Sequence, residues 1–249
     1  MDLVYSTGYK GIEFSRTKAL GNGDECCNYR YRKKEGNRNM DLVWFLIIGL
    51  IGSVLMLSGD MSLYYSKDDY KTDGTMWPVI NIMKDVSKGR LYYGAMIGPI
   101  SAFAYCIGYY HIVKMMTDYS WLGWLGFLCG SLGIIIGGAF HSHWVYYGRL
   151  GKLDDKPALE EVIAFCKLIN TVSYFIIGVG FLVILIVLIS GFTVFPRWIA
   201  LFSPGVLFLL LPLLRKLPKG LHMIICGGWS NLISVIYYIV AIVVYLAAG

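Results

Sequence analysis

The sequence is poor in charged residues. Asp, Glu, Lys and Arg make up 15% of its 249 residues, whereas hydrophobic residues make up 57%. Soluble domains contain about 25% charged residues, so a soluble globular fold is excluded. The net charge of +6 comes from bases that lie mainly between apolar segments, where they meet anionic lipid headgroups. We therefore predict a polytopic membrane protein whose partner is the lipid bilayer and not a nucleic acid.

Metal-binding and disulfide motifs are also lacking. The chain has six cysteines but no Cys-x-x-Cys motif, and four of the six fall inside apolar runs. A thiol in such a run behaves as a small hydrophobic group. This pattern predicts neither a disulfide framework nor a thiolate metal site, and the sequence identifies no cofactor.

Residues 1–40 lack the apolar stretch of a signal peptide and show neither helical nor strand periodicity. They are polar and basic, and they end in the segment YRYRKKEGNR close to Met40. Such a composition is typical of disordered segments. We predict a disordered basic tail at 1–40, followed by a helical domain at 41–249.

Six long apolar runs follow the tail, and each reaches the length of about 20 residues that a helix needs to cross a bilayer. They lie at 42–60, 92–114, 121–145, 161–190, 196–215 and 221–247. Because peptide groups within lipid must hydrogen-bond internally, we predict an all-α bundle of about six transmembrane helices. Pro204 and Pro212 predict a kink in the fifth run.

Basic residues are distributed unevenly between the two sides of the predicted bundle. The loops after the first, third and fifth runs contain eleven Lys and Arg, whereas the short loops on the other side contain only Lys114 and Arg197. The tail adds eight bases to that second side, but short loops predict orientation better than long polar tails. We expect a multi-pass cell-membrane protein with the eleven-base side in the cytoplasm and both termini outside.

Small residues line one face of the third run. Glycine recurs every three or four positions, at Gly123, Gly126, Gly130, Gly133 and Gly137. Such a stripe lets helices approach closely, so this face is expected to point into the bundle. His141 continues the stripe, whereas His143 points roughly the opposite way and is expected at the membrane interface. On a helix, this His-x-His pair cannot readily share a metal ion.

Three other runs also place polar residues on one helical face. The first run aligns Gly49, Ser53, Met56 and Asp60. The fourth aligns Glu160, Lys167, Thr171, Tyr174 and Gly178, which is a polar stripe for a helix in lipid. The sixth aligns Gly227, Asn231, Ser234 and Tyr238.

Ionisable groups within a bilayer are costly unless they face an interior and have partners. We therefore expect a polar cavity near the cytoplasmic face. Its predicted ligand-binding residues are Asp60, His141, Glu160, Lys167, Thr171, Tyr174 and Asn231. The alternative is a set of ordinary helix-end charges that never meet.

Three functions are compatible with such a cavity. The first, which we favour, is binding or transport of a small or lipid-like molecule between the helices. The second is a membrane-embedded enzyme, either an acid/base isomerase that uses Asp60 and His141 or a metal-dependent hydrolase with Asp60, His141 and Glu160 as ligands. The third is a structural membrane subunit without buried chemistry.

Four short motifs support this architecture. They are Gly59-Asp60, Gly94-x-x-x-Gly98-Pro99, Ala139-Phe140-His141 and Phe195-Pro196-Arg197-Trp198. Together they resemble an uncharacterised family of bacterial six-span integral membrane proteins, over residues from about 41 to the end of the chain. The resemblance implies six spans and marks Asp60 and His141 as positions to test, but it implies no activity. The architecture is also similar in outline to membrane zinc hydrolases that include ceramidases, although the sixth run supplies only His222 where that family has paired histidines.

Overall fold

The chain divides into two compact units, Met1–Asn39 (with Gly249) and Met40–Ala248. The computed structural model describes residues 12–16, 29–33, 40–66, 75–214 and 217–247. In the first unit, strand β1 (Ile12–Arg16) pairs antiparallel with strand β2 (Tyr29–Lys33). The rest of the predicted tail before Met40 lies outside the described residues, and its disorder stays a prediction.

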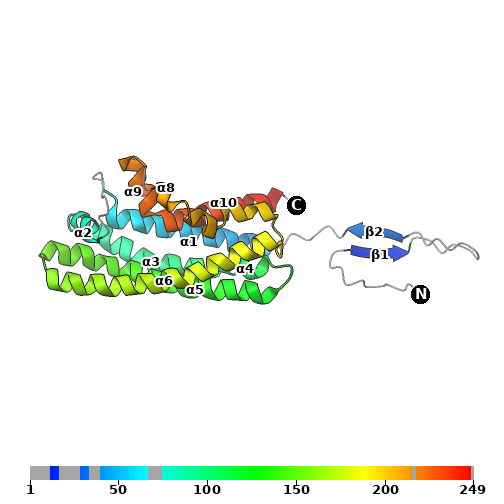
Figure 1. Cartoon of the computed structure of the whole chain (residues 1–249), viewed down its shortest axis with the longest axis horizontal. Helices are drawn as coiled ribbons and strands as arrows, with labels where there is room; N and C mark the ends of the chain where they lie inside the picture. The colour runs from blue at the N-terminus through cyan, green and yellow to red at the C-terminus, as the bar shows by residue number, and fades with distance from the viewer. Residues whose placement is uncertain (1–11, 17–28, 34–39, 67–74, 215–216, 248–249) are drawn as a thin grey trace, which may run out of the picture. The chain divides into compact units, whose positions relative to one another are not determined.

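The second unit is a bundle of long apolar helices (Figure 1). Within the described part, five helices are long and apolar enough to cross a membrane. They are α1 (Met40–Tyr64), α3 (Lys88–Tyr109) continued by α4 (His111–Lys114), α5 (Ser120–Leu153), α6 (Lys156–Ser190) and α10 (Trp229–Ala247). The all-α transmembrane fold predicted from the sequence is therefore confirmed, with five clear spanning helices where about six were expected.

The predicted fifth span at 196–215 is not one continuous helix. Its residues form a 3-10 helix, η1 (Arg197–Phe202), and two short helices, α7 (Pro204–Phe208) and α8 (Leu211–Leu214). Proline lacks a backbone N–H and its ring clashes with the preceding helical turn, so Pro204 and Pro212 each prevent a helix from continuing through them. The sequence predicted a kink here, and the structure has full interruptions.

The predicted sixth span at 221–247 is divided as well. Helix α9 (Lys219–Gly227) ends at Gly228, and α10 begins at Trp229. A side chain at Gly228 would lie 2.1 Å from Leu57 of α1, so glycine allows this break to lie against α1. The break places Asn231 in the first turn of α10, beside the carboxyl-terminal part of α1.

Glycine also sets how closely the other helices pack. Four of the five glycines predicted to line the inner face of α5 are buried, and a Cβ added at Gly133 would lie 2.4 Å from Ile177 of α6. Helices α1 and α3 approach backbone to backbone, since a Cβ on Gly108 would lie 2.4 Å from the Cα of Gly49. The inward orientation of the glycine face is thus confirmed.

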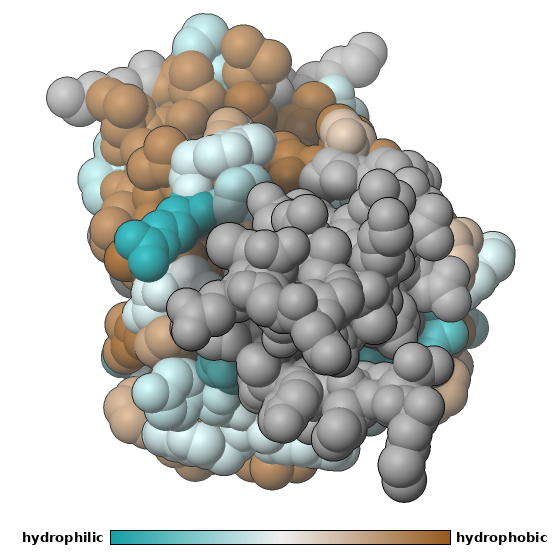
Figure 2. All heavy atoms as spheres, turned by 90° about the vertical axis from the view of Figure 1, so that its right-hand side faces the viewer, coloured by the Kyte–Doolittle hydropathy of each residue, from teal (hydrophilic) through white to brown (hydrophobic). Residues whose placement is uncertain are grey.

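The outer faces of these helices are apolar. Large exposed side chains follow α6 at Leu168, Phe175, Leu182, Ile186 and Ile189. A lipid environment suits these apolar side faces, because lipid tails solvate apolar side chains as well as a protein interior does. In the view onto one end of the molecule, hydrophobic residues gather over the upper part of the coloured surface and weakly polar residues over its lower part (Figure 2).

Arg90 closes the carboxyl end of α1. Its guanidinium donates to the backbone oxygens of Ser62 and Met61, each at 3.2 Å, and of Tyr65 at 3.0 Å. The end of a helix leaves carbonyls short of backbone partners, although Met61 O also accepts from the N–H of Tyr65 at 3.1 Å, and a cation there interacts favourably with the helix dipole.

We expect Arg90→Ala to loosen the last turn of α1 and to lower the free energy of unfolding by about 1 kcal/mol. Amide hydrogen exchange of residues 61–65 and thermal unfolding in detergent measure the two effects. The exposed Arg149 at the end of α5 provides a matched control, since Arg149→Ala removes the same charge elsewhere. Equal exchange of residues 61–65 in both variants would show that the cap has no role.

Candidate functional site

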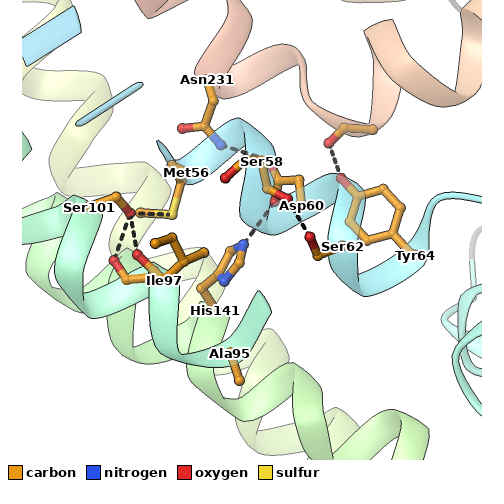
Figure 3. A network of polar contacts seen from close by, with 12 residues as sticks. Met56, Ser58, Asp60, Ser62, Tyr64, Ala95, Ile97, Ser101, His141 and Asn231 are labelled. Carbon is orange, nitrogen blue, oxygen red and sulfur yellow. Dashed lines mark hydrogen bonds and ion pairs between the residues drawn. The ribbon is translucent and has the colours of Figure 1, made fainter. Parts of the chain in front are cut away.

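Asp60, His141 and Asn231, which come from three different helices, meet in a hydrogen-bond network near the carboxyl end of α1 (Figure 3). Asp60 of α1 accepts a hydrogen bond from Asn231 of α10, with 2.7 Å between Nδ2 and Oδ2. The other carboxylate oxygen, Oδ1, lies 3.0 Å from Nε2 of His141 on α5. Tyr105 of α3 donates its hydroxyl to Oδ1 of Asn231 at 3.1 Å. The carboxylate therefore joins α1, α5 and α10 directly, and Asn231 extends the network to α3.

The members of this network are buried. The exposed fractions are 8% for Asp60, 6% for His141, 7% for Asn231 and 1% for Tyr105. Among the described residues, Asp60 is the one buried carboxylate. A carboxylate in a bilayer is tolerated when it faces the bundle interior and has partners, and Asp60 meets both conditions. Its position in the network is therefore physically reasonable for a spanning helix.

Two glycines make room for the imidazole of His141. A Cβ on Gly59 would lie 2.9 Å from Cε1, and a Cβ on Gly98 would lie 2.7 Å from Cβ of His141 and 3.0 Å from Nδ1. Nδ1 is buried, has no hydrogen-bond partner within the part of the chain that the structure describes, and lies beside Gly98 of α3, while Nε2 faces Asp60. The sequence motifs Gly59-Asp60 and Gly98-Pro99 thus correspond to the walls of the histidine site.

A cavity of about 480 Å³ adjoins the network. Its polar lining comprises Asp60, His141, Asn170, Ser173, Ser230, Asn231 and Ser234. Aromatic rings form much of the remaining wall, and among them are Tyr64, Tyr105, Phe140, Trp144 and Tyr174. A cavity of this size, mostly apolar with a few convergent polar groups, is typical of a small-molecule site.

Not all of the predicted ligand-binding residues line this cavity. Asp60, His141, Tyr174 and Asn231 do, whereas Glu160, Lys167 and Thr171 are exposed on α6 and are absent from the lining. The prediction placed those three on the wrong face of the helix. The buried face of α6 contains Leu159, Cys166 and Ser173.

The physical reason is that the polar stripe of α6 is offset by one residue from its buried stripe. Glu160 follows Leu159 and Lys167 follows Cys166, and each step turns the helix by about 100°. The polar stripe therefore lies next to the buried stripe and not on it. Tyr174 follows Ser173, and its long side chain reaches the cavity from the boundary between the two faces although it is 43% exposed.

The predicted metal ligand set is not assembled. Glu160 is exposed and separated from the buried pair formed by Asp60 and His141. Among the residues that the structure describes, no group of three or more His, Cys, Asp and Glu side chains could hold a metal ion. His143 diverges from His141 as expected, since its Nδ1 lies 2.7 Å from the carbonyl oxygen of Ala139 on its own helix.

A second buried histidine, His111, was not predicted from the sequence. His111 is fully buried, with Nδ1 2.8 Å from the carbonyl oxygen of Gly108 and Nε2 3.1 Å from the hydroxyl of Tyr237. It lies at the junction of α3 and α4, away from Asp60 along the bundle. Neither glycine spacing nor a charged neighbour marks this residue in the sequence, although its place inside an apolar run was a usable signal.

Comparisons with known proteins identify a family. No curated protein and no solved structure matches the chain. A family model described as a family of unknown function (DUF6796) matches residues 39–248. This range covers the whole helical unit, including every member of the Asp60 network. The chain therefore belongs to this family of unknown function.

Proposed function

We propose that this protein binds a small lipid-like molecule in the cavity beside Asp60 and His141. The observation that supports this most directly is a cavity of about 480 Å³ whose lining combines many apolar and aromatic side chains with the linked polar groups of Asp60, His141 and Asn231. An amphipathic molecule would place its polar group against Asp60 and Asn231 and its apolar part against Ile177 and Phe181. Ligand sites between the helices of a bundle have this character.

The geometry of the imidazole favours binding over acid/base catalysis. A histidine that is oriented by a carboxylate acts on substrate through its other ring nitrogen. In His141 that nitrogen is Nδ1, which is buried against Gly98 and does not open into the cavity. The enzymatic alternative with Asp60 and His141 as a catalytic pair would need this ring to turn.

We also propose that the cavity lies near the cytoplasmic face. Asp60 is near the carboxyl end of α1, and the bases between the apolar runs are concentrated on that side. Lys and Arg in short loops accumulate on the cytoplasmic side of membrane proteins. A ligand would then enter from the inner leaflet or from the cytoplasm.

The proposal is tested by filling the cavity without touching the polar network. Gly137 lines the cavity, and a Cβ added there would meet only Ser173 at 3.2 Å and Ile134 at 3.9 Å. We expect wild-type protein purified in a mild non-ionic detergent to retain a small molecule that Gly137→Leu loses. Native mass spectrometry and mass spectrometry of solvent extracts detect it.

Gly178→Leu is the matched control, because Gly178 is on the exposed face of α6 with nothing within 4 Å of an added Cβ. It should retain the molecule as the wild type does. Identical bound molecules in the wild type and in Gly137→Leu would show that this cavity is not the binding site.

A further inference from the structure

We infer that the ligand in this cavity carries an ammonium group. This inference rests on the proposed function and specifies its ligand class. The first observation is charge: among the residues that the structure describes, the cavity lining includes the carboxylate of Asp60 and no lysine or arginine. The one basic side chain in the lining is His141, and its Nε2 already faces Asp60 at 3.0 Å.

An anionic headgroup would find no suitable partner here. If His141 is neutral, the site has one negative charge, and if the ring is protonated, its charge is paired with Asp60. In neither state does the lining offer a positive charge that is free of Asp60. An anion buried without a counter-charge is strongly disfavoured, so phosphate and sulfate headgroups are excluded from the polar end.

A cation can use Asp60 without displacing its partners. A carboxylate has about four acceptor positions. His141 contacts Oδ1 and Asn231 donates to Oδ2, so each carboxylate oxygen has one of these two partners. The Asp60 side chain remains 12% exposed. An ammonium group at this surface would be attracted by the carboxylate while the existing hydrogen bonds remain.

The second observation is an aromatic wall in the adjacent helical turn. Tyr64 lies four residues after Asp60 on α1, and Trp144 lies three residues after His141 on α5, so each ring is on the same helical face as its polar neighbour. The rings of Tyr64 and Trp144 are in contact, with centroids 5.4 Å apart. Phe140 packs edge-on against Trp144 at 5.6 Å.

Aromatic rings beside a carboxylate are a typical binding site for ammonium groups. Ring faces attract cations through their quadrupole, with tryptophan the strongest, and the attraction increases when the cation is desolvated. Tyr64, Phe140 and Trp144 all line the cavity together with Asp60. A neutral headgroup would gain no cation–π attraction from these rings, so the combination favours positive charge.

The test compares probes that share one apolar tail. Hexyltrimethylammonium, hexyl sulfate and 1-hexanol are titrated into the full-length protein in a maltoside detergent, with binding followed by calorimetry and by thermal stability. We expect hexyltrimethylammonium to bind at least about tenfold more tightly than the other two probes. A fourth probe, hexylphosphocholine, identifies the source of the ammonium group: tight binding indicates a lipid headgroup, and weak binding indicates a free amine.

Variants of the aromatic wall separate recognition from folding. Trp144→Leu should raise the dissociation constant of hexyltrimethylammonium about fivefold, and Trp144→Phe should raise it less because a ring face remains. Trp124→Leu is the control, since Trp124 is an exposed tryptophan of the same helix. Asp60→Asn should weaken ammonium binding about tenfold and should weaken 1-hexanol binding much less.

Equal affinities for hexyltrimethylammonium, hexyl sulfate and 1-hexanol would overturn the inference, as would tighter binding of hexyl sulfate. So would unchanged ammonium binding in both Trp144→Leu and Asp60→Asn. Each of these results leaves the proposed function intact if Gly137→Leu still loses a molecule that the wild type retains. Loss of that difference would instead contradict the proposed function itself.

Discussion

Gly108→Ala is expected to destabilise the helical bundle by about 3 kcal/mol or more. The added Cβ would lie 2.4 Å from the Cα and 2.7 Å from the backbone N of Gly49. Backbone atoms cannot move aside as the end of a side chain can, so α1 and α3 must separate along their contact. That separation would also disturb Tyr105 and Asp60, which these two helices supply to the polar network.

Gly178→Ala is the matched control for this prediction. It adds the same methyl group to a spanning helix, but nothing lies within 4 Å of the new Cβ. Because alanine favours a helix over glycine, we expect no loss of stability and a gain of up to about 1 kcal/mol. Thermal unfolding in detergent, followed by circular dichroism, measures both variants. Equal melting temperatures would show that the contact between Gly49 and Gly108 does not limit helix packing.

The sequence predicted the spanning helices well where apolar length was the signal. A run of about 20 apolar residues fixes a helix in lipid because no other conformation satisfies its peptide groups. The same criterion failed at 196–215, where η1, α7 and α8 replace one span. Apolar composition does not show whether a segment crosses the bilayer or folds back against other helices. In this segment, the prolines determine where the helix is interrupted.

The two central residues of the candidate site could be predicted because small residues indicate which helical face is inside. Asp60 and His141 each extend a stripe of small residues, and those stripes are the faces at which α1 and α5 pack. The structure places the two side chains in contact at 3.0 Å. Their role in binding stays a prediction that the ligand experiments test.

The inward face of helix α6 was predicted wrongly. Its polar stripe contains no small residues at close contacts, and polarity alone was taken as the sign of an inward face. Lys167 is exposed, and a lysine near the end of a spanning helix can extend its aliphatic stem along apolar surface toward the headgroups. The inward residues, Cys166 and Ser173, are less polar than their neighbours and gave a weaker signal.

Sequence patterns did not predict contacts between site residues that are far apart in the sequence. Tyr105 lies on the same helical face as Gly98 and Ser101, but nothing in the sequence predicts its hydrogen bond to Asn231, 126 positions away. That contact depends on the break between α9 and α10, because the break determines which side of Asn231 faces α1. Tertiary geometry of this kind follows from helix packing and not from the local sequence.

Asp60→Ala is expected to destabilise the bundle by about 3–5 kcal/mol, because removing one partner of a buried pair leaves the other uncompensated. His141 would lose its contact at 3.0 Å and Asn231 its contact at 2.7 Å. Asp60→Asn keeps the shape and part of the hydrogen bonding, so a smaller loss of about 1–3 kcal/mol is expected. Unfolding in mixed micelles at increasing denaturing-detergent fraction measures each free energy of unfolding.

A double-mutant cycle isolates the contact between Asp60 and His141 from the cost of each substitution. Once Asp60 is alanine, His141 has no carboxylate partner to lose, so the double variant should be less destabilised than the sum by about 1–3 kcal/mol. The control cycle pairs Asp60→Ala with His143→Ala, since His143 bonds to Ala139 on its own helix. That pair should be additive within about 0.5 kcal/mol. Additive effects in both cycles would mean that the carboxylate and the imidazole stabilise the fold independently, and the polar end of the cavity would then not act as a unit.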